Sequence, residues 1–287
     1  MKADKRFVNL PLDFWANVRA VSESIGYTRK KASTILEPSL EDIKKAMKKR
    51  GLSCGHLISP LENKPTPTGR LLCAYFKYRA KVLNDYVRPR LMDVRRAKAE
   101  FEKLKCRLKP SCPLPMNKQK GDKKAPAYLT GIVNMLIEAN AKNHACDLNP
   151  RQLTSFTRNG APLRTLSRRV DGVFPETNNP VALWEIKEYY YTTTFGSRIA
   201  DGVYETLLDG MELKELHENT QTKALHYLII DAYNTWWDMG RSYLCRIIDA
   251  LSMGYIDEVL FGYEVVEKLP TIVRHWGKVC ESRNRKQ

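Results

Sequence analysis

Apolar residues recur at helical spacing along the first third of the chain. Residues 38–51 form the clearest unit, with Ile43 and Met47 spaced by four. Ser39 can cap this helix and Gly51 can end it. The pattern therefore predicts a helix here.

A second helical pattern runs from residue 70 to residue 108 and is both apolar and basic. Pro89 interrupts it, because proline breaks helical hydrogen bonding. Together the two patterns predict an all-helical module over residues 1–108.

Residues 109–126 differ from both neighbours, since they hold four prolines and five lysines with almost no apolar content. This composition predicts an extended linker. A positive linker can follow a phosphate backbone, and it can equally be a solvated hinge.

After the linker, strand patterns alternate with helical ones. A helix is expected at 127–142, then two strands at 163–174 and 180–191, joined by a turn. Further along, the pattern predicts a helix at 197–210, a strand at 224–231, a helix at 238–254 and a strand at 257–265. Strands separated by helices imply a mixed sheet covered on both faces, so residues 127–287 are expected to form an α/β core.

Composition narrows the setting of the chain. No stretch approaches the roughly 20 apolar residues that a membrane crossing needs, and the first residues lack the apolar centre of a secretion signal. The seven cysteines are scattered without a C-x-x-C pair, which disfavours a disulfide framework or a zinc ribbon. We expect a cytoplasmic protein with reduced thiols and no membrane partner.

The charge is strongly uneven. Residues 1–150 hold 31 Lys and Arg against 14 Asp and Glu, a net charge of +17, whereas residues 151–287 hold 17 against 18, a net charge of −1. A basic surface attracts polyanions, of which nucleic acid is the commonest in a cell. The helical module is therefore expected to engage DNA.

Charged residues interrupt the second strand of the core in an unusual way. Glu185 and Lys187 lie two positions apart within an otherwise apolar run, so they share one face of the strand. Asp171 lies near the end of the preceding strand. If the two strands pair as a hairpin, all three side chains converge.

Two converging carboxylates repel each other, and a hard divalent cation such as Mg²⁺ relieves the repulsion. A lysine beside the metal can orient or deprotonate a water. This chemistry suits phosphodiester hydrolysis. The same residue pattern also arises in a surface strand with a cross-strand ion pair. The flanking Leu183, Trp184 and Ile186 argue against a solvent-exposed edge strand.

The runs VDGVF, LWEIKEYYYTTTFGSRIADGVYE and HYLIID, in this order, resemble the PD-(D/E)XK nuclease superfamily, and within it the type II restriction endonucleases. The resemblance covers about residues 127–265. It implies that Asp171, Glu185 and the carbonyl of Ile186 bind Mg²⁺ and that Lys187 assists the attacking water. Val170 replaces the proline of the family motif.

Further residues are candidates for the same site. The resemblance makes Glu138 a possible additional acid, although it can equally face solvent. Glu205 shares a helix face with Arg198 and Asp201, which any amphipathic helix can show. DNA contacts are expected from a group after the lysine: Thr193, Thr194, Ser197 and Arg198. The threonines can also begin a helix cap, and both roles can hold at once.

The expected activity is Mg²⁺-dependent, sequence-specific cleavage of double-stranded DNA. The resemblance implies 5′-phosphate products and a cognate DNA methyltransferase as genetic partner. Cutting both antiparallel strands is most simply done by two copies, so a homodimer is expected, with its contact in the N-terminal helices or in an apolar stripe at Ile272, Val273 and Trp276. That stripe can equally pack against its own core.

Two alternatives remain open. One is a PD-(D/E)XK nuclease of DNA repair or junction resolution, which reads DNA shape. The other is a non-catalytic DNA-binding regulator, for which the basic helices alone would suffice.

Overall fold

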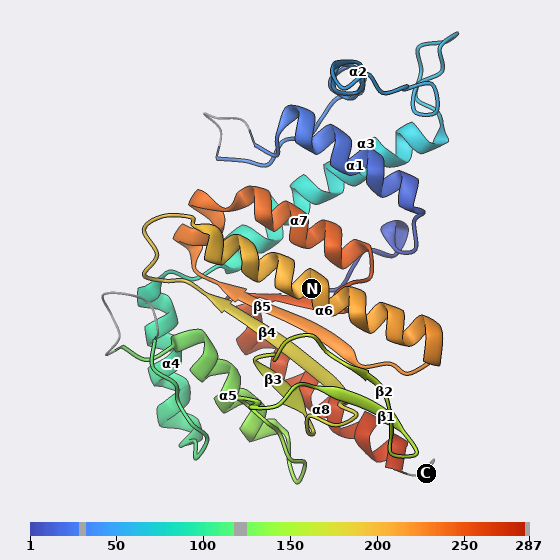
Figure 1. Ribbon diagram of the computed structural model, residues 1–287. Helices are drawn as coiled ribbons and strands as arrows, with labels where there is room; N and C mark the ends of the chain where they lie inside the picture. The colour runs from blue at the N-terminus through green and yellow to red at the C-terminus, as the bar shows by residue number, and fades with distance from the viewer. Residues whose placement is uncertain (29–32, 118–124, 285–287) are drawn as a thin grey trace.

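The protein is described here by a computed structural model that covers residues 1–28, 33–117 and 125–284. Its centre is a four-stranded sheet with the order β3-β4-β5-β6 (Figure 1). The strands are β3 (Gly172–Phe174), β4 (Ala182–Glu188), β5 (Leu225–Asp231) and β6 (Glu258–Phe261). β3 runs antiparallel to β4, whereas β4, β5 and β6 run parallel. The expected α/β fold with a mixed sheet is thus confirmed.

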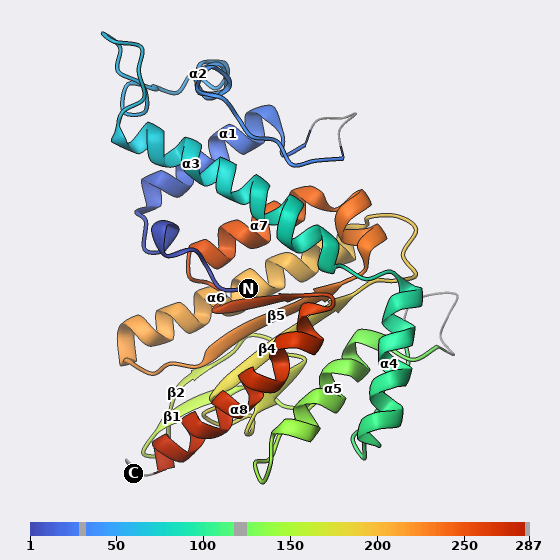
Figure 2. The ribbon, with the colours of Figure 1, turned by 180° about the vertical axis from the view of Figure 1, so that it is seen from behind.

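Helices cover both faces of the sheet, as Figure 1 and the reverse view in Figure 2 show. α6 (Ser197–Thr220) and α7 (Arg241–Ser252) lie on one face, and α5 (Tyr128–Asn140) and α8 (Glu264–Asn284) on the other. Because side chains alternate along a strand, Trp184 packs toward α8 while Glu185 and Lys187 face α6. The alternation therefore places the two charged groups on the α6 side.

The prediction of one continuous strand at 163–174 is wrong, because the middle of this segment is not a strand. Its first part is β2 (Ala161–Thr165), which pairs with β1 (Ser155–Arg158) as a separate two-stranded sheet, and only its last residues join the main sheet as β3. The segment between them is held by α6. Ser167 donates to Glu212 from its backbone N–H and its hydroxyl, and Arg168 pairs with Asp209. Side chains of α6 thus replace a strand partner.

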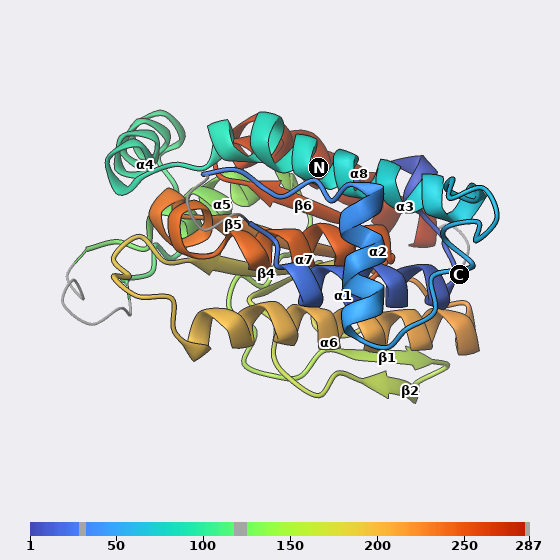
Figure 3. The same cartoon turned by 90° about the horizontal axis from the view of Figure 1, so that it is seen from above.

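The first part of the chain is helical, as expected. α1 (Leu12–Ile25) and α3 (Pro67–Lys81) lie on the α7 side of the sheet, α2 (Leu40–Lys49) packs on α1 further from the sheet (Figure 2 and Figure 3), and α4 (Val94–Leu108) lies beside α5. The short helical segments are η1 (Lys5–Phe7), η2 (Val82–Val87), η3 (Arg88–Arg90) and, before α7, η4 (Asn234–Met239). Ser39 and Asp42 form a capping box at the start of α2.

Buried polar contacts join the helical part to the sheet. Arg79 of α3, only 1% exposed, pairs with Asp249 of α7 at 3.0 Å, and the hydroxyl of Tyr75 donates to the same carboxylate. The backbone N–H of Met92 donates to Asp231 at the end of β5, at 2.7 Å. The helices are therefore anchored in the core by contacts that exclude water.

The expected linker, residues 109–126, is described only in part, because 118–124 lie outside the described residues. Next to that gap, Asn117 N donates to Ala125 O and Ala127 N donates to Pro115 O, at 2.8 Å each. The division into 1–108, 109–126 and 127–287 stays a prediction.

The apolar stripe of α8 belongs to the core. Val273 and Trp276 are fully buried, and the ring of Trp276 stacks on that of Trp184 with centroids 5.5 Å apart. Ile272 is half-buried against the same cluster. The proposal that this stripe forms a dimer contact is therefore wrong, since its two large side chains are already covered.

Within the described ranges, no helix combines the length and the apolar character needed to cross a membrane. All seven cysteines are free thiols, as expected.

Candidate functional site

The β3–β4 hairpin brings Asp171 beside Glu185. In its register Gly172 pairs with Trp184, and a Cβ at position 172 would lie 2.1 Å from the Trp184 ring, so only glycine fits. Asp171 N lies 3.2 Å from Glu185 Oε1 and also 3.2 Å from Trp184 O. The hairpin expected from the sequence thus exists and makes the two acids neighbours.

Asp171 is fixed by the backbone of β4. Its Oδ2 accepts a hydrogen bond from Ile186 N at 2.8 Å, and the carboxylate faces a pocket. Surrounding protein atoms, followed by the negative charge of Glu185, raise the pKa of Asp171 to about 6. Although Asp171 as a residue is exposed, its carboxylate lies against the backbone of β4, and an added cation would favour its ionised form.

Glu185 is fully buried and held by cations. Lys187 Nζ lies 2.7 Å from its Oε2, and Arg168 donates to both of its oxygens, at 2.9 and 3.2 Å. Burial alone would raise the pKa of Glu185, but the charges of Lys187 and Arg168 outweigh burial and lower it. Glu185 is therefore ionised.

Lys187 bridges β4 and α6. Its ammonium group also lies 3.1 Å from Glu205 Oε2, and only 8% of the residue is exposed. Burial would lower the pKa of Lys187, but the charges of Glu185 and Asp171 raise it above its usual value. Lys187 was expected either to orient a water or to deprotonate it. The raised pKa favours orienting, because the ammonium group keeps its proton.

Two charged residues of the cluster were missed from the sequence. Arg168 lies in the segment before β3, and its guanidinium reaches three acids: Glu185, Glu205 at 3.4 Å and Asp209 at 2.6 Å. Asp209 follows Glu205 by four residues on α6, a spacing that could have revealed it. Arg168 has no comparable signal, because its place depends on the path of an irregular segment.

Asp209 is fully buried, and its Oδ1 has no hydrogen-bond partner among the described residues. Burial raises its pKa to about 7, although the nearby Arg168 opposes this. A buried carboxylate oxygen without a partner is costly and marks a group that can accept another donor.

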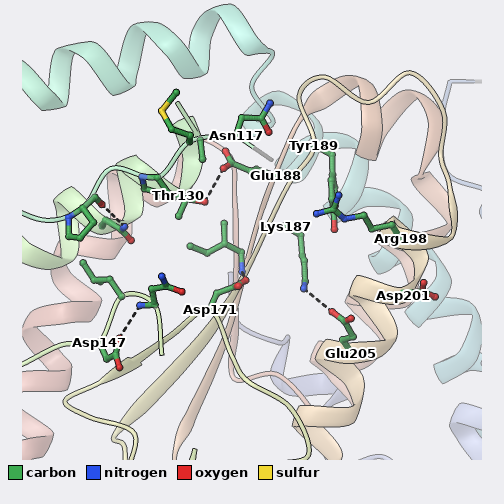
Figure 4. Close-up of a pocket in the computed structure, with 18 of the residues that line it drawn as sticks. Asn117, Thr130, Asp147, Asp171, Lys187, Glu188, Tyr189, Arg198, Asp201 and Glu205 are labelled. Carbon is green, nitrogen blue, oxygen red and sulfur yellow. Dashed lines mark hydrogen bonds and ion pairs between the residues drawn. The ribbon is translucent and has the colours of Figure 1, made fainter. Parts of the chain in front are cut away.

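A cavity of about 760 Å³ opens beside these groups. Figure 4 shows Asp171 and Lys187 pointing into it, with Glu205 and Arg198 on the α6 side and Thr130 and Glu188 on the α5 side. Glu188 closes the far wall by accepting from Leu129 N at 2.7 Å and Thr130 Oγ1 at 2.9 Å. Such a volume is typical of ligand sites.

Other predicted residues lie at varying distances from this cavity. Ser197 and Arg198 line it, whereas Thr193 and Thr194 are exposed in the preceding loop and do not. Glu138 is not a lining residue either, since its carboxylate accepts from the N–H and hydroxyl of Ser111. Only Glu205 of the two additional acids reaches the cluster.

No group of three His, Cys, Asp or Glu side chains in the described part of the chain is arranged to hold a metal. Arg168 pairs with three of the acids, Glu185, Glu205 and Asp209. The donors nevertheless suit a hard cation in type, since Asp171 faces the cavity and the neighbouring groups are carboxylates.

Two family models match the sequence. Residues 92–276 match a domain of unknown function (DUF7687), and residues 1–86 match a second domain of unknown function (DUF7690). Neither a curated protein nor a solved structure matched the chain. The first match spans more than half of the sequence and includes β3, β4, α6 and the charged cluster between them. The chain therefore belongs to the DUF7687 family.

Proposed function

We propose that the protein is a Mg²⁺-dependent endonuclease that cuts double-stranded DNA, with a core of the restriction-endonuclease type. The observation that carries this proposal is the meeting of Asp171, Glu185 and Lys187 where the β3–β4 hairpin borders a cavity. Two carboxylates and an amine beside an open space are the groups that metal-assisted hydrolysis of a phosphodiester needs. A protein that only binds DNA has no use for them.

The charge balance of the cluster supports a divalent cation. Three carboxylates (Glu185, Glu205 and Asp209) pair with two cations, Arg168 and Lys187. The carboxylate of Asp171 is a fourth acid close enough to feel the charge of Glu185. With all groups ionised, the cluster carries two uncompensated negative charges. Burial raises the pKa of Asp171 to about 6 and that of Asp209 to about 7, and the negative charge of Glu185 adds to both shifts. One Mg²⁺ would neutralise the excess negative charge.

The residues that would hold the metal are Asp171, Glu185 and the carbonyl of Ile186. When bound, Mg²⁺ would activate a water and stabilise the negative charge that develops on the phosphate. Lys187, kept protonated by its neighbours, would donate a hydrogen bond to the phosphate or the water. Glu205 would fix the direction of that ammonium group.

Two basic helices, which lie far apart in the molecule (Figure 1), offer positive charge to the DNA backbone. Exposed basic residues follow the outer faces of two helices: Lys45, Lys48 and Lys49 in α2, and Arg95, Arg96, Lys98, Lys103, Lys105 and Arg107 in α4. Such charges bind phosphates without reading sequence. Arg198 and Ser197, at the cavity, are proposed to contact the strand that is cut.

Sequence-specific cutting, as in a type II restriction endonuclease, is our first choice, with a homodimer cutting both strands and a cognate methyltransferase protecting the host DNA. The competing enzyme is a nuclease that recognises branched DNA. A non-catalytic regulator is the third reading.

A cleavage screen distinguishes the three readings. The full chain is incubated with Mg²⁺ and either unmethylated plasmid or DNA with branches and flaps. Discrete fragments whose ends share one sequence support the restriction enzyme, and sequencing of those ends gives the site. Selective cutting of branched DNA supports the repair reading. Binding without cutting of any substrate would contradict both nuclease readings.

A further inference from the structure

Glu185 has no acceptor position left for a metal. A carboxylate offers about four lone-pair positions. Four donors occupy them: Lys187 Nζ at 2.7 Å, Arg168 Nη1 at 2.9 Å, Arg168 Nη2 at 3.2 Å and Asp171 N at 3.2 Å. A cation that binds Glu185 must therefore displace one of these donors.

Arg168 is the donor best able to leave. Asp171 N belongs to the backbone of the hairpin and cannot move alone. The side chain of Lys187 is 9% exposed, whereas that of Arg168 is 23% exposed and has an acid of its own, Asp209, that Lys187 does not pair with. The Arg168 Nη2 contacts are also long, at 3.2 Å to Glu185 and 3.4 Å to Glu205.

Asp209 offers Arg168 a second place to bind. Arg168 Nη1 already lies 2.6 Å from Asp209 Oδ2, its shortest contact, and the buried Oδ1 of the same carboxylate lacks a partner among the described residues. A guanidinium binds a carboxylate best through two parallel hydrogen bonds. Turning Nη2 from Glu185 toward Asp209 Oδ1 would create that pair.

We propose that Arg168 is a positioning residue that occupies Glu185 in the metal-free protein and, when a divalent cation binds, moves onto both oxygens of Asp209. This inference rests on the proposed metal site. The cation repels the guanidinium and replaces it on Glu185, while the fork on Asp209 keeps that buried carboxylate paired. Asp209 then acts only through Arg168 and does not touch the metal.

Titration calorimetry with Mn²⁺ alone, on the full-length chain without DNA, tests this exchange. Arg168→Gln frees Glu185 and should tighten Mn²⁺ binding about tenfold, whereas Asp209→Asn removes the alternative acceptor and should weaken it about tenfold, within the range known for residues behind metal ligands. The double variant Arg168→Gln/Asp209→Asn should bind Mn²⁺ with the same affinity as Arg168→Gln alone.

Matched controls are available near both positions. Arg169 is an exposed neighbour, and Glu218 is an exposed acid on the same helix as Asp209. Arg169→Gln and Glu218→Gln should leave Mn²⁺ affinity unchanged. Thermal unfolding in chelator checks that each variant is folded. If Arg168→Gln unfolds, Arg168→Lys keeps the charge without the fork and should tighten binding by a smaller factor.

Each contrary outcome has a distinct meaning. Weaker or unchanged binding by folded Arg168→Gln or Arg168→Lys would overturn the exchange, because Arg168 would then support Glu185 or have no effect on it. A double variant weaker than Arg168→Gln would overturn it too, since Asp209 would be acting without Arg168. Absence of Mn²⁺ binding in every protein, wild type included, would overturn the metal site itself and the role of Arg168 with it.

Discussion

Lys187 Nζ lies 3.1 Å from Glu205 Oε2, so a residue of β4 and a residue of α6 meet on one side of the cavity. The contact fixes a side chain that is otherwise flexible. The ammonium group lines the cavity, and its charge is balanced by the carboxylates of Glu185 and Glu205.

Lys187→Met should reduce DNA cleavage at least about a hundredfold, because it removes the positioned donor of the reaction while keeping the length of the side chain. Binding of DNA, measured by fluorescence anisotropy, should change little. Lys214→Met, at an exposed lysine of α6, is the control. Cleavage by Lys187→Met at the wild-type rate would remove Lys187 from the mechanism.

Gly202→Ala should separate activity from stability. A Cβ at position 202 would lie 3.2 Å from both Cδ and Cε of Lys187, so the lysine must shift by a few tenths of an ångström. Alanine favours a helix over glycine by roughly 1 kcal/mol, and thermal stability should therefore hold or rise. Cleavage should fall, by about tenfold if the shift misaligns the ammonium group. Equal loss of both properties would show that the residue is only structural.

Asp249→Ala should destabilise the whole protein. It leaves Arg79 buried without its carboxylate, a loss of about 3–5 kcal/mol in the free energy of unfolding. Asp85→Ala removes the exposed ion pair with Lys81 and should cost under about 1 kcal/mol. Urea unfolding measures both. Similar small losses would mean that the ion pair between Arg79 and Asp249 contributes little to holding α3 against α7.

Asp231 should make stability depend on pH. Burial raises its pKa to about 7, so the native state keeps a proton that the unfolded chain loses near pH 4. The contribution of Asp231 to the free energy of unfolding therefore falls as pH rises from about 4 to about 7 and is constant above that range.

Asp231→Asn removes this titration while keeping an oxygen that can accept from Met92 N. The melting temperature of the wild type minus that of the variant should be larger at pH 5 than at pH 8, by at least about 2 °C. Thermal unfolding monitored by circular dichroism measures both values. A pH-independent difference would mean that Asp231 has an ordinary pKa in the folded protein.

The sequence was sufficient for the parts of the site that depend on strand alternation. Glu185 and Lys187 share a face because they are two residues apart, and the turn after Phe174 folds Asp171 back beside them. Arg168 could not be predicted, because it lies between β2 and β3 in a segment held by side chains of α6. Short strands such as β1 and β2 also lack enough residues for a period to be recognised.

The sequence could not show which surface buries the apolar stripe of α8, because periodicity does not identify the packing partner of a helix. An apolar stripe on a helix predicts burial, but burial against the same chain and against a second copy leave the same pattern. In this protein Trp276 of α8 stacks on Trp184 of β4 in the same chain.

Asp171 is central to the proposed site, because it faces the cavity and its carboxylate accepts a hydrogen bond from the backbone of β4. The most direct measurement compares wild type and Asp171→Asn on unmethylated DNA containing the cleaved sequence, in Mg²⁺, in Ca²⁺ and in excess chelator. We predict cleavage by the wild type in Mg²⁺ alone, 5′-phosphate ends, and DNA binding without cleavage by Asp171→Asn. Cleavage that persists in excess chelator, or that Asp171→Asn performs at the wild-type rate, would contradict the proposed metal-dependent nuclease.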